Sequence, residues 1–109
     1  HELFVVKPDG GIWRLRTGQP AELLIEQLSS KDWGNWLLGE DGILYIQRTL
    51  EADLIKLQTW AGSRQLIASL PPRAIKSGRS ITQLPDGSLI LSTYQSKEAD
   101  IVAIDLAIP

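Results

Sequence analysis

Few side chains in this 109-residue chain could do chemistry. There is no Cys, so disulfides and Cys-metal sites are excluded, and we assign no role to the single His, His1. Two acidic triplets, Glu51-Ala52-Asp53 and Glu98-Ala99-Asp100, could in principle supply the paired carboxylates of a glycosidase or a Ca²⁺ site. The D-x-[DN] spacing of a calcium loop is absent, and the recurrence of one triplet indicates two separate structural units. We therefore expect each Asp to cap its own turn through the backbone.

No nucleophile is evident either. Residues 29–32, Ser-Ser-Lys-Asp, combine a Ser with a Lys, a pair that can be nucleophilic, but the composition is typical of a polar loop. Gly10-Gly11 has no phosphate-binding spacing and no helix after it. We expect no catalytic residue, no metal site and no cofactor.

The four Trp residues are many for a chain of this length, and exposed Trp favours recognition. Trp33 and Trp36 flank Gly34, and we consider them a candidate platform for contact with a ligand or partner, with packing as the alternative. Trp13 is expected to pack between structural units, because large aromatic side chains usually lie in cores. Trp60 is expected to cover a hairpin.

A short basic segment is the second candidate for partner contact. Arg73, Lys76 and Arg79 lie close together and could meet an anionic partner, with a solvated loop as the alternative. The formal net charge of the chain is −2, which argues against nucleic-acid binding by this segment. No apolar run approaches the roughly 20 residues needed to span a bilayer. The chain has no Met, which we interpret as the sign of an excised or processed fragment.

The sequence contains an internal repeat. Each acidic triplet follows an Asp-Gly pair, Asp41-Gly42 in the first copy and Asp86-Gly87 in the second. The triplets recur at 47 residues and the Asp-Gly pairs at 45, a difference that we assign to a longer loop before the second triplet. Residues 12–28 also align without gaps on residues 54–70, at an offset of 42. These spacings fall within the range of about 40–50 residues that is typical of β-propeller blades.

The repeated units have the pattern of β-strands. Short apolar runs alternate with turn signals such as Pro85-Asp86-Gly87, in which Pro fixes φ and Gly adopts a positive φ at low cost. Continuous apolar runs, such as Ile43 to Ile46, predict strands that are covered on both faces. We expect strands at residues 2–7, 11–16, 21–28, 33–38, 43–48, 53–59, 64–70, 79–84, 88–94 and 100–106.

Residues 78–106, GRSITQLPDGSLILSTYQSKEADIVAIDL, resemble the WD-like Pro-Asp-Gly blade of β-propellers, although Leu84 stands where the family often has Ser. The segment looks most like the last blade of the sensor portion of membrane-bound winged-helix transcriptional regulators. It is also similar to Tol-type periplasmic propellers and to the propellers that precede prolyl-peptidase catalytic domains. The resemblance implies a periplasmic or other extracytoplasmic sensor, while the lack of Cys fits the cytoplasm equally well.

We therefore expect an all-β chain that forms one domain, residues 1–109. It would be a partial β-propeller of about two and a half four-stranded antiparallel blades, with units at about 2–28, 29–70 and 71–106. The alternative is rearrangement into a small β-sandwich or barrel. Because propellers close rings of typically about 4–8 blades, we expect a protein partner or self-association to complete the ring.

The expected function is that of a sensory or protein-interaction module and not of an enzyme. The site residues we would assign to partner contact are Trp33, Trp36, Arg73, Lys76 and Arg79. One alternative is the substrate-gating propeller portion of a serine peptidase or other hydrolase. The other is a structural fragment with no separable activity.

Overall fold

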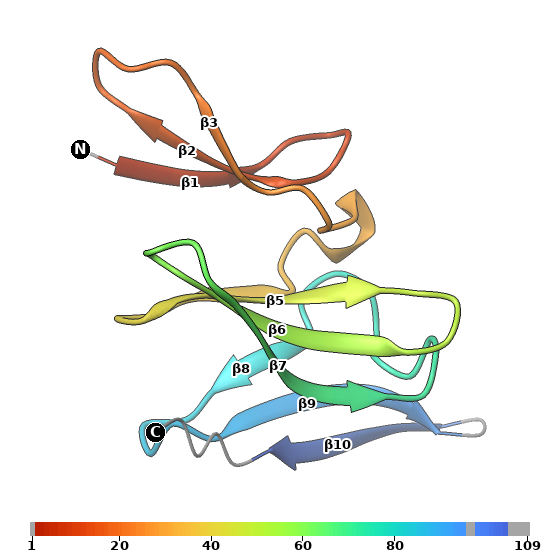
Figure 1. Cartoon of the computed structure of the whole chain (residues 1–109). Coiled ribbons are helices and arrows are strands. Elements are labelled where there is room, and N and C mark those ends of the chain that lie inside the picture. The colour runs from red at the N-terminus through yellow and green to blue at the C-terminus, as the bar shows by residue number, and fades with distance from the viewer. Residues whose placement is uncertain (1, 96–97, 105–109) are drawn as a thin grey trace.

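Strands form nearly all of the regular structure (Figure 1). The computed structural model describes residues 2–95 and 98–104, with side chains as far as residue 93. In this part of the chain the one helix is a short 3-10 helix, η1 (Ser30–Asp32), and no helix has the length and apolar character needed to cross a bilayer. The strands are β1 (Glu2–Val6), β2 (Ile12–Arg16), β3 (Glu22–Ile25), β4 (Trp36–Leu38), β5 (Gly42–Arg48), β6 (Asp53–Thr59), β7 (Arg64–Leu70), β8 (Ile81–Gln83), β9 (Leu89–Gln95) and β10 (Glu98–Ile104).

The strands form three antiparallel sheets, each made of strands that are consecutive in the chain. The first sheet has the order β1-β2-β3, the second β4-β5-β6-β7 and the third β10-β9-β8. The prediction of an all-β chain is confirmed. None of the three sheets closes into a barrel within the described residues, so the barrel alternative is wrong for this part of the chain.

Four strands differ from the prediction by more than one residue at an end. β3 ends at Ile25, three residues before the expected end at 28. β4 and β8 are shorter than the expected 33–38 and 79–84, because η1 and a turn fill residues 30–34 and bends extend through residue 79. The strand expected at 100–106 begins earlier, at Glu98, and residues 105 and 106 lie outside the described part of the chain.

The three sheets stack face to face, with the four-stranded sheet in the middle (Figure 1). Successive side chains of β5 point to opposite faces of the middle sheet. Ile43 and Tyr45 therefore pack toward the first sheet, and Leu44 and Ile46 pack toward the third. β5 is therefore covered on both faces, as its continuous apolar run predicted. The first interface buries Ile12, Ile25, Leu28, Ile43 and Tyr45, and the second buries Leu44, Ile46, Ile55, Leu57, Ile75, Ile81, Leu89 and Leu91.

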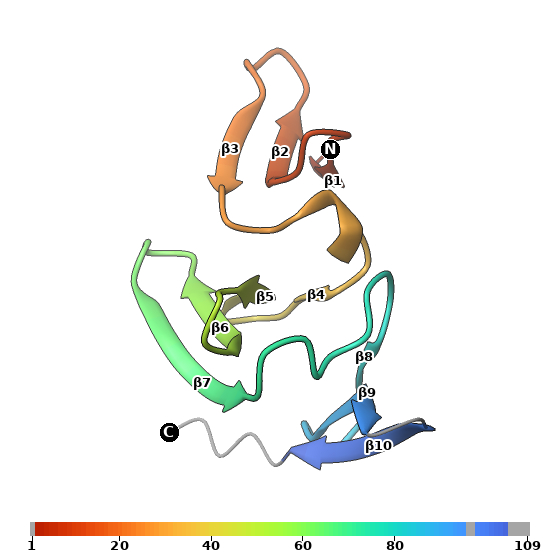
Figure 2. The same ribbon diagram turned by 90° about the vertical axis from the view of Figure 1, so that its right-hand side faces the viewer.

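Different strands form the two sides of the stack. Figure 2 shows η1, β4 and β8 on one side of the stack, and β3 and β7 on the other. β4 and β8 are edge strands of their own sheets, and they begin at the same end of the molecule. This edge is the one that carries the candidate site.

The β2–β3 and β6–β7 hairpins each contain one shift in the register of strand pairing, and this shift shows which of their residues are equivalent. The pairing register shifts between Ile12 and Trp13 in the first, and between Ile55 and Lys56 in the second. The structural offset is therefore 43 residues, not the 42 of the gapless sequence alignment. Ile12 and Ile55, both fully buried, become equivalent. A slip of one residue exchanges the two faces of a strand, so the sequence alignment matched buried positions with partly exposed ones.

The two acidic triplets are not at equivalent positions either. The first triplet precedes β6 and only Asp53 lies in that strand, where it pairs with Arg48, whereas the second triplet lies entirely in β10 and Asp100 pairs with Thr93 two residues inside the strand. The triplets mark the same strand of successive sheets but not the same register.

The loop lengths explain part of the 47-residue spacing. The connection before β6 has four residues, and the connection before β10 has two, so the expected longer second loop is wrong. The insertion lies in the preceding turn instead. Three residues separate Leu84 from its hydrogen-bonded partner Ser88, against two between Gly39 and Gly42 in the earlier sheet.

Candidate binding site between strands β4 and β8

A buried ion cluster fixes the segments that frame the site. Asp32, at the end of η1, and Asp53, the first residue of β6, are each 1% exposed. Arg48, at the end of β5, donates hydrogen bonds of 2.7 and 3.0 Å to Asp32 Oδ1 and Oδ2 and one of 2.6 Å to Asp53 Oδ2. Burial by itself lowers the pKa of Arg48, but the hydrogen bonds and charges of the two carboxylates outweigh it and raise the pKa. Arg48 is therefore held in its charged form and makes a charge-assisted bidentate contact with Asp32.

Asp53 does not cap its own turn, contrary to the expectation from the sequence. Its carboxylate accepts hydrogen bonds from the backbone N–H groups of Arg73 and Ile75, at 3.1 and 3.0 Å. The turn is capped by Thr49 instead, whose hydroxyl oxygen accepts from the Ala52 N–H at 3.0 Å. Asp53 thereby ties the second sheet to the segment that leads into the third.

Asn35 extends this network to the start of β8. It is fully buried, and its side-chain oxygen accepts hydrogen bonds from the backbone N–H and the hydroxyl of Ser80, at 2.6 and 3.0 Å. Its amide nitrogen donates to Asp32 Oδ1 at 2.8 Å and to the Lys76 carbonyl at 2.9 Å. A buried amide with all of these partners specifies one arrangement of the two segments, because each lost bond would leave a polar group unpaired.

Gly34 allows the two segments to approach each other closely. Its backbone N–H donates to the Gly78 carbonyl at 3.0 Å. A Cβ atom at position 34 would lie 2.7 Å from Arg79 Cβ and 3.1 Å from Arg79 Cα, so a side chain there would force the segments apart. Glycine at this position therefore sets the distance between Trp33 and Arg79.

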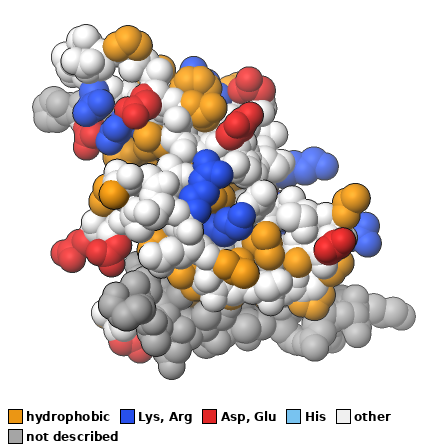
Figure 3. Space-filling view, viewed as in Figure 1, with side chains coloured by type: hydrophobic (Ala, Val, Ile, Leu, Met, Phe, Trp, Pro, Cys, Tyr) orange, Lys and Arg blue, Asp and Glu red, His pale blue; other side chains and the backbone are white. Residues whose placement is uncertain are grey.

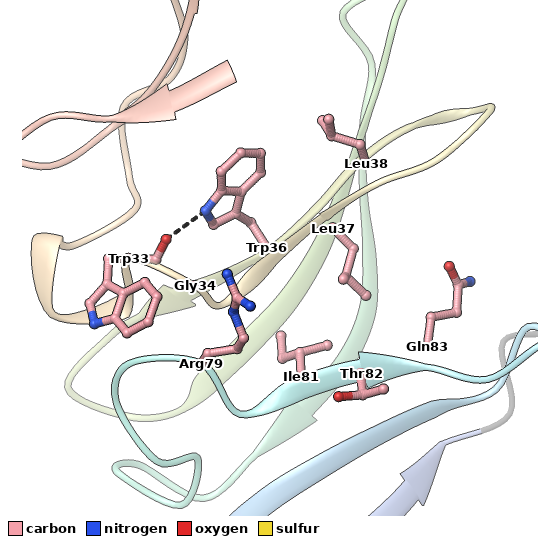
Figure 4. Close-up of a pocket in the computed structure, with 9 residues that line it drawn as sticks. All are labelled: Trp33, Gly34, Trp36, Leu37, Leu38, Arg79, Ile81, Thr82 and Gln83. Carbon is pink, nitrogen blue, oxygen red and sulfur yellow. Dashed lines mark hydrogen bonds between the residues drawn. The ribbon is translucent and has the colours of Figure 1, made fainter. Parts of the chain in front are cut away.

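The segments enclose a groove between β4 and β8 (Figure 4). Trp36 Nε1 donates to the Trp33 carbonyl at 2.7 Å, and the Arg79 guanidinium carbon lies 5.5 Å from the centre of the Trp33 ring. Trp33 is 54% exposed, whereas Trp36 is half-buried against the apolar residues of the interface between the first and middle sheets. The hollow has a volume of about 520 Å³ and is lined by Trp33, Gly34, Trp36, Leu37, Leu38, Arg79, Ile81, Thr82 and Gln83.

A second hollow continues the groove toward the β4–β5 turn. It measures about 500 Å³ and shares Leu37, Leu38 and Gln83 with the first. Its far end is formed by Glu40 and Asp41, both exposed. The groove is thus apolar along its walls, basic at the Arg79 end and acidic at the other.

Three of the five residues predicted for partner contact meet in this groove: Trp33, Trp36 and Arg79. Arg73 and Lys76 do not line it. The backbones of both belong to the framework of the site, since the Arg73 N–H donates to Asp53 and the Lys76 carbonyl accepts from Asn35. A role of any of the five in binding stays a prediction.

The other two Trp residues serve contacts between segments. The Trp13 ring is half-buried, and Nζ of Lys7, the residue that follows β1, lies 3.8 Å from the centre of the ring. Trp60 donates from Nε1 to the Glu40 carbonyl at 2.9 Å, so it covers the β4–β5 hairpin. Its ring also lies 5.9 Å from that of Phe4 in the first sheet, which links the first two layers.

The described charged side chains do not gather into a metal-binding group. On the face shown in Figure 3, acidic and basic side chains are interspersed around apolar side chains of the middle sheet. No group of three or more His, Cys, Asp or Glu side chains that could hold a metal ion occurs among the residues described by the structure. The two acidic triplets belong to different sheets, since the first leads into β6 and the second lies in β10.

Sequence reasoning missed the ion cluster and the Asn35 network. One signal was available, because Arg48 and Asp53 flank a short polar turn and strand pairing places such residues opposite each other. The contribution of Asp32 and of Asn35 had no local signal. Comparison with known proteins gives no further guide, since no protein-family model, curated protein or solved structure matches this chain.

Proposed function

We propose that this chain is a non-enzymatic sensory or protein-interaction module built from consecutive blades of a β-propeller. Support comes from the order of its parts, since each sheet is formed by consecutive antiparallel strands and the sheets stack face to face. The first and third sheets have three strands each. The ring would be completed by a protein partner or by a second copy of the chain.

The observation that carries the functional proposal is the groove between β4 and β8. In a propeller, the first strand of each blade lines the central channel, and β4 and β8 are the first strands of their sheets. Trp33 is exposed, and Arg79 forms no ion pair with a described residue; Trp and Arg are the side chains that dominate binding energy in protein interfaces. The apolar walls would supply contact area and the guanidinium would supply orientation.

The resemblance of residues 78–106 to the last sensor blade of membrane-bound winged-helix regulators supports a finer proposal. The chain would belong to the extracytoplasmic sensor of such a regulator and would contact its signal at the channel mouth. This step rests on the resemblance between the sequences.

Site-specific photocrosslinking tests the proposal. Gln83, exposed in the groove, is replaced by a photoactivatable phenylalanine, and Gln65, exposed on β7, is replaced in the control. After irradiation in cells that carry the parent protein, we expect one discrete crosslinked partner from position 83 and not from position 65. Equal capture at both positions, or none at position 83, would contradict a recognition site in this groove.

A further inference from the structure

We propose that the groove between β4 and β8 binds the C-terminal tail of a partner protein as an extended strand, with the terminal carboxylate at Arg79. This inference rests on the proposed interaction function and names the class of ligand. It follows from the length of the groove, the free backbone edges along it and the charges at its ends.

The groove has the shape of a site for an extended chain. Its two hollows, about 520 and 500 Å³, share lining residues and follow β4 from Trp33 to Asp41. At about 3.3 Å per residue, the stretch from Trp36 to Asp41 is matched by a peptide of about six residues. A compact small molecule would fill one hollow and leave the other empty.

Backbone groups along both walls face away from their own sheets. In β4, the Asn35 carbonyl accepts from the Ile46 N–H and the Gly39 N–H donates to the Gly42 carbonyl, so these residues bond toward β5. Because bonding alternates along an antiparallel strand, the peptide groups of Trp36 and Leu38 point outward. They are free to pair with an added strand.

The same alternation applies to β8. The Ser80 carbonyl accepts from the Ser92 N–H and the Leu84 N–H donates to the Ser88 carbonyl, both toward β9. The peptide groups of Ile81 and Gln83 therefore point away from the third sheet. An added peptide gains main-chain hydrogen bonds from such edges and specificity from the side-chain pockets beside them.

The charges at the two ends give the peptide a direction. Arg79 is exposed and forms no ion pair with any described residue, and its guanidinium lies beside the Trp33 ring. Glu40 and Asp41 likewise form no ion pair with a described residue. A terminal carboxylate at Arg79 and a basic residue about five positions earlier would complement both ends.

This direction agrees with strand geometry. β4 and β8 both run from the Trp33 and Arg79 end toward the acidic end. A peptide whose C-terminus lies at Arg79 runs antiparallel to both, the orientation with the more stable hydrogen-bond pattern.

The test uses a pool of acetylated hexapeptides with Lys first, four randomised positions and Leu last, prepared as the free acid and as the C-terminal amide. Each pool is passed over the immobilised chain, and retention is measured by mass spectrometry. We expect the free acid to be retained about tenfold more than the amide, because a charge-assisted bidentate contact is lost with the amide. Arg79→Gln should abolish this preference, and Arg64→Gln, on the opposite edge strand, should leave it intact.

Equal retention of the two pools, or retention of neither, would overturn the tail proposal. A preference for the acid that survives Arg79→Gln would overturn it as well, since the carboxylate would then bind elsewhere. Circular dichroism of the variants establishes that they are folded. A crosslinked partner at position 83 without any acid preference would leave the interaction function standing and reject only the C-terminal tail.

Discussion

Arg48 and Asp53 face each other across the β5–β6 hairpin, where Arg48 Nη1 lies 2.6 Å from Asp53 Oδ2. The same guanidinium also donates to Asp32, which lies at the end of η1, before β4. This one cation thus joins the middle sheet to the segment before it and, through Asp53, to the segment after it. The position of the groove depends on that junction, because Trp33 follows Asp32 directly and Arg79 follows the loop held by Asp53.

Removing the cation should strongly destabilise the chain. We expect Arg48→Ala to lower the free energy of unfolding by about 3 kcal/mol or more, because two carboxylates that are 1% exposed would be left buried without their counter-ion. Arg14→Ala is the matched control, since its bond to Glu22 has the same 2.6 Å length but is exposed, and it should cost less than about 1 kcal/mol. Urea denaturation measures both, and equal losses would show that burial of the pair is not decisive.

Tyr45 should make the fold sensitive to alkali. Burial raises its pKa above the ordinary 10.0, with the charge of Arg64 opposing, and its hydroxyl has no hydrogen-bond partner among the described residues. The folded chain therefore holds the phenol proton where the unfolded chain has lost it, so this stability is complete below pH 10 and is lost as the pH rises above it.

Tyr45→Phe isolates this contribution. We expect the variant to be as stable as the parent at pH 7, or up to about 1 kcal/mol more stable, because an unpaired buried hydroxyl is removed. Its advantage should grow between pH 10 and pH 11 when unfolding free energies are measured across that interval. A constant difference at all pH values would mean that Tyr45 titrates alike in both states.

Gly34→Ala tests the close approach of the two segments. The added Cβ would lie 2.7 Å from Arg79 Cβ, and we expect a loss of about 1–3 kcal/mol together with a shift in Trp emission as Arg79 leaves the Trp33 ring. Gly39→Ala is the control, because its Cβ would meet nothing nearer than 3.7 Å. An unchanged emission spectrum in Gly34→Ala would contradict the role assigned to this glycine.

Self-association should be detectable if the stack is part of a ring. β1 and β10 are edge strands, and Leu3 on β1 is 63% exposed. Sedimentation velocity at micromolar concentration should show a species larger than the monomer, and Leu3→Glu should shift it toward monomer. Leu50→Glu, at a turn position that is 99% exposed, should have no effect. A stable monomer at every concentration would reject self-association.

The strand content could be predicted because turn residues and apolar runs act locally. Pro85-Asp86-Gly87 and Asp41-Gly42 mark hairpins whatever surrounds them. Register could not be predicted in the same way. Along β5 every position from Gly42 to Ile46 is buried, so the apolar pattern lacks the alternation that fixes which face is which. The one-residue error in aligning residues 12–28 with residues 54–70 arose in other strands, β2–β3 and β6–β7, where residue identity alone does not show which face of a strand a Leu occupies.

The candidate site was predictable only in part. Trp33, Trp36 and Arg79 could be chosen by residue type, but they are brought together by Asn35 and Ser80, which are 45 residues apart and have no local pattern. Asp53 was assigned to its own turn for the same reason, since its partners Arg73 and Ile75 lie in a distant segment. Buried polar links of this kind depend on tertiary packing, which a single sequence does not display.

The most direct test of a recognition groove compares Trp33→Ala with Trp36→Ala, both for stability and for photocapture from position 83. Trp33 is 54% exposed, so its replacement should cost less than about 1 kcal/mol of unfolding free energy yet abolish capture of the partner. Trp36 packs against the apolar residues of the interface between the first and middle sheets, so Trp36→Ala should lower the free energy of unfolding by about 2 kcal/mol or more. If Trp33→Ala unfolds the chain, or if it leaves capture unchanged, Trp33 is a packing residue and the groove is not a recognition site.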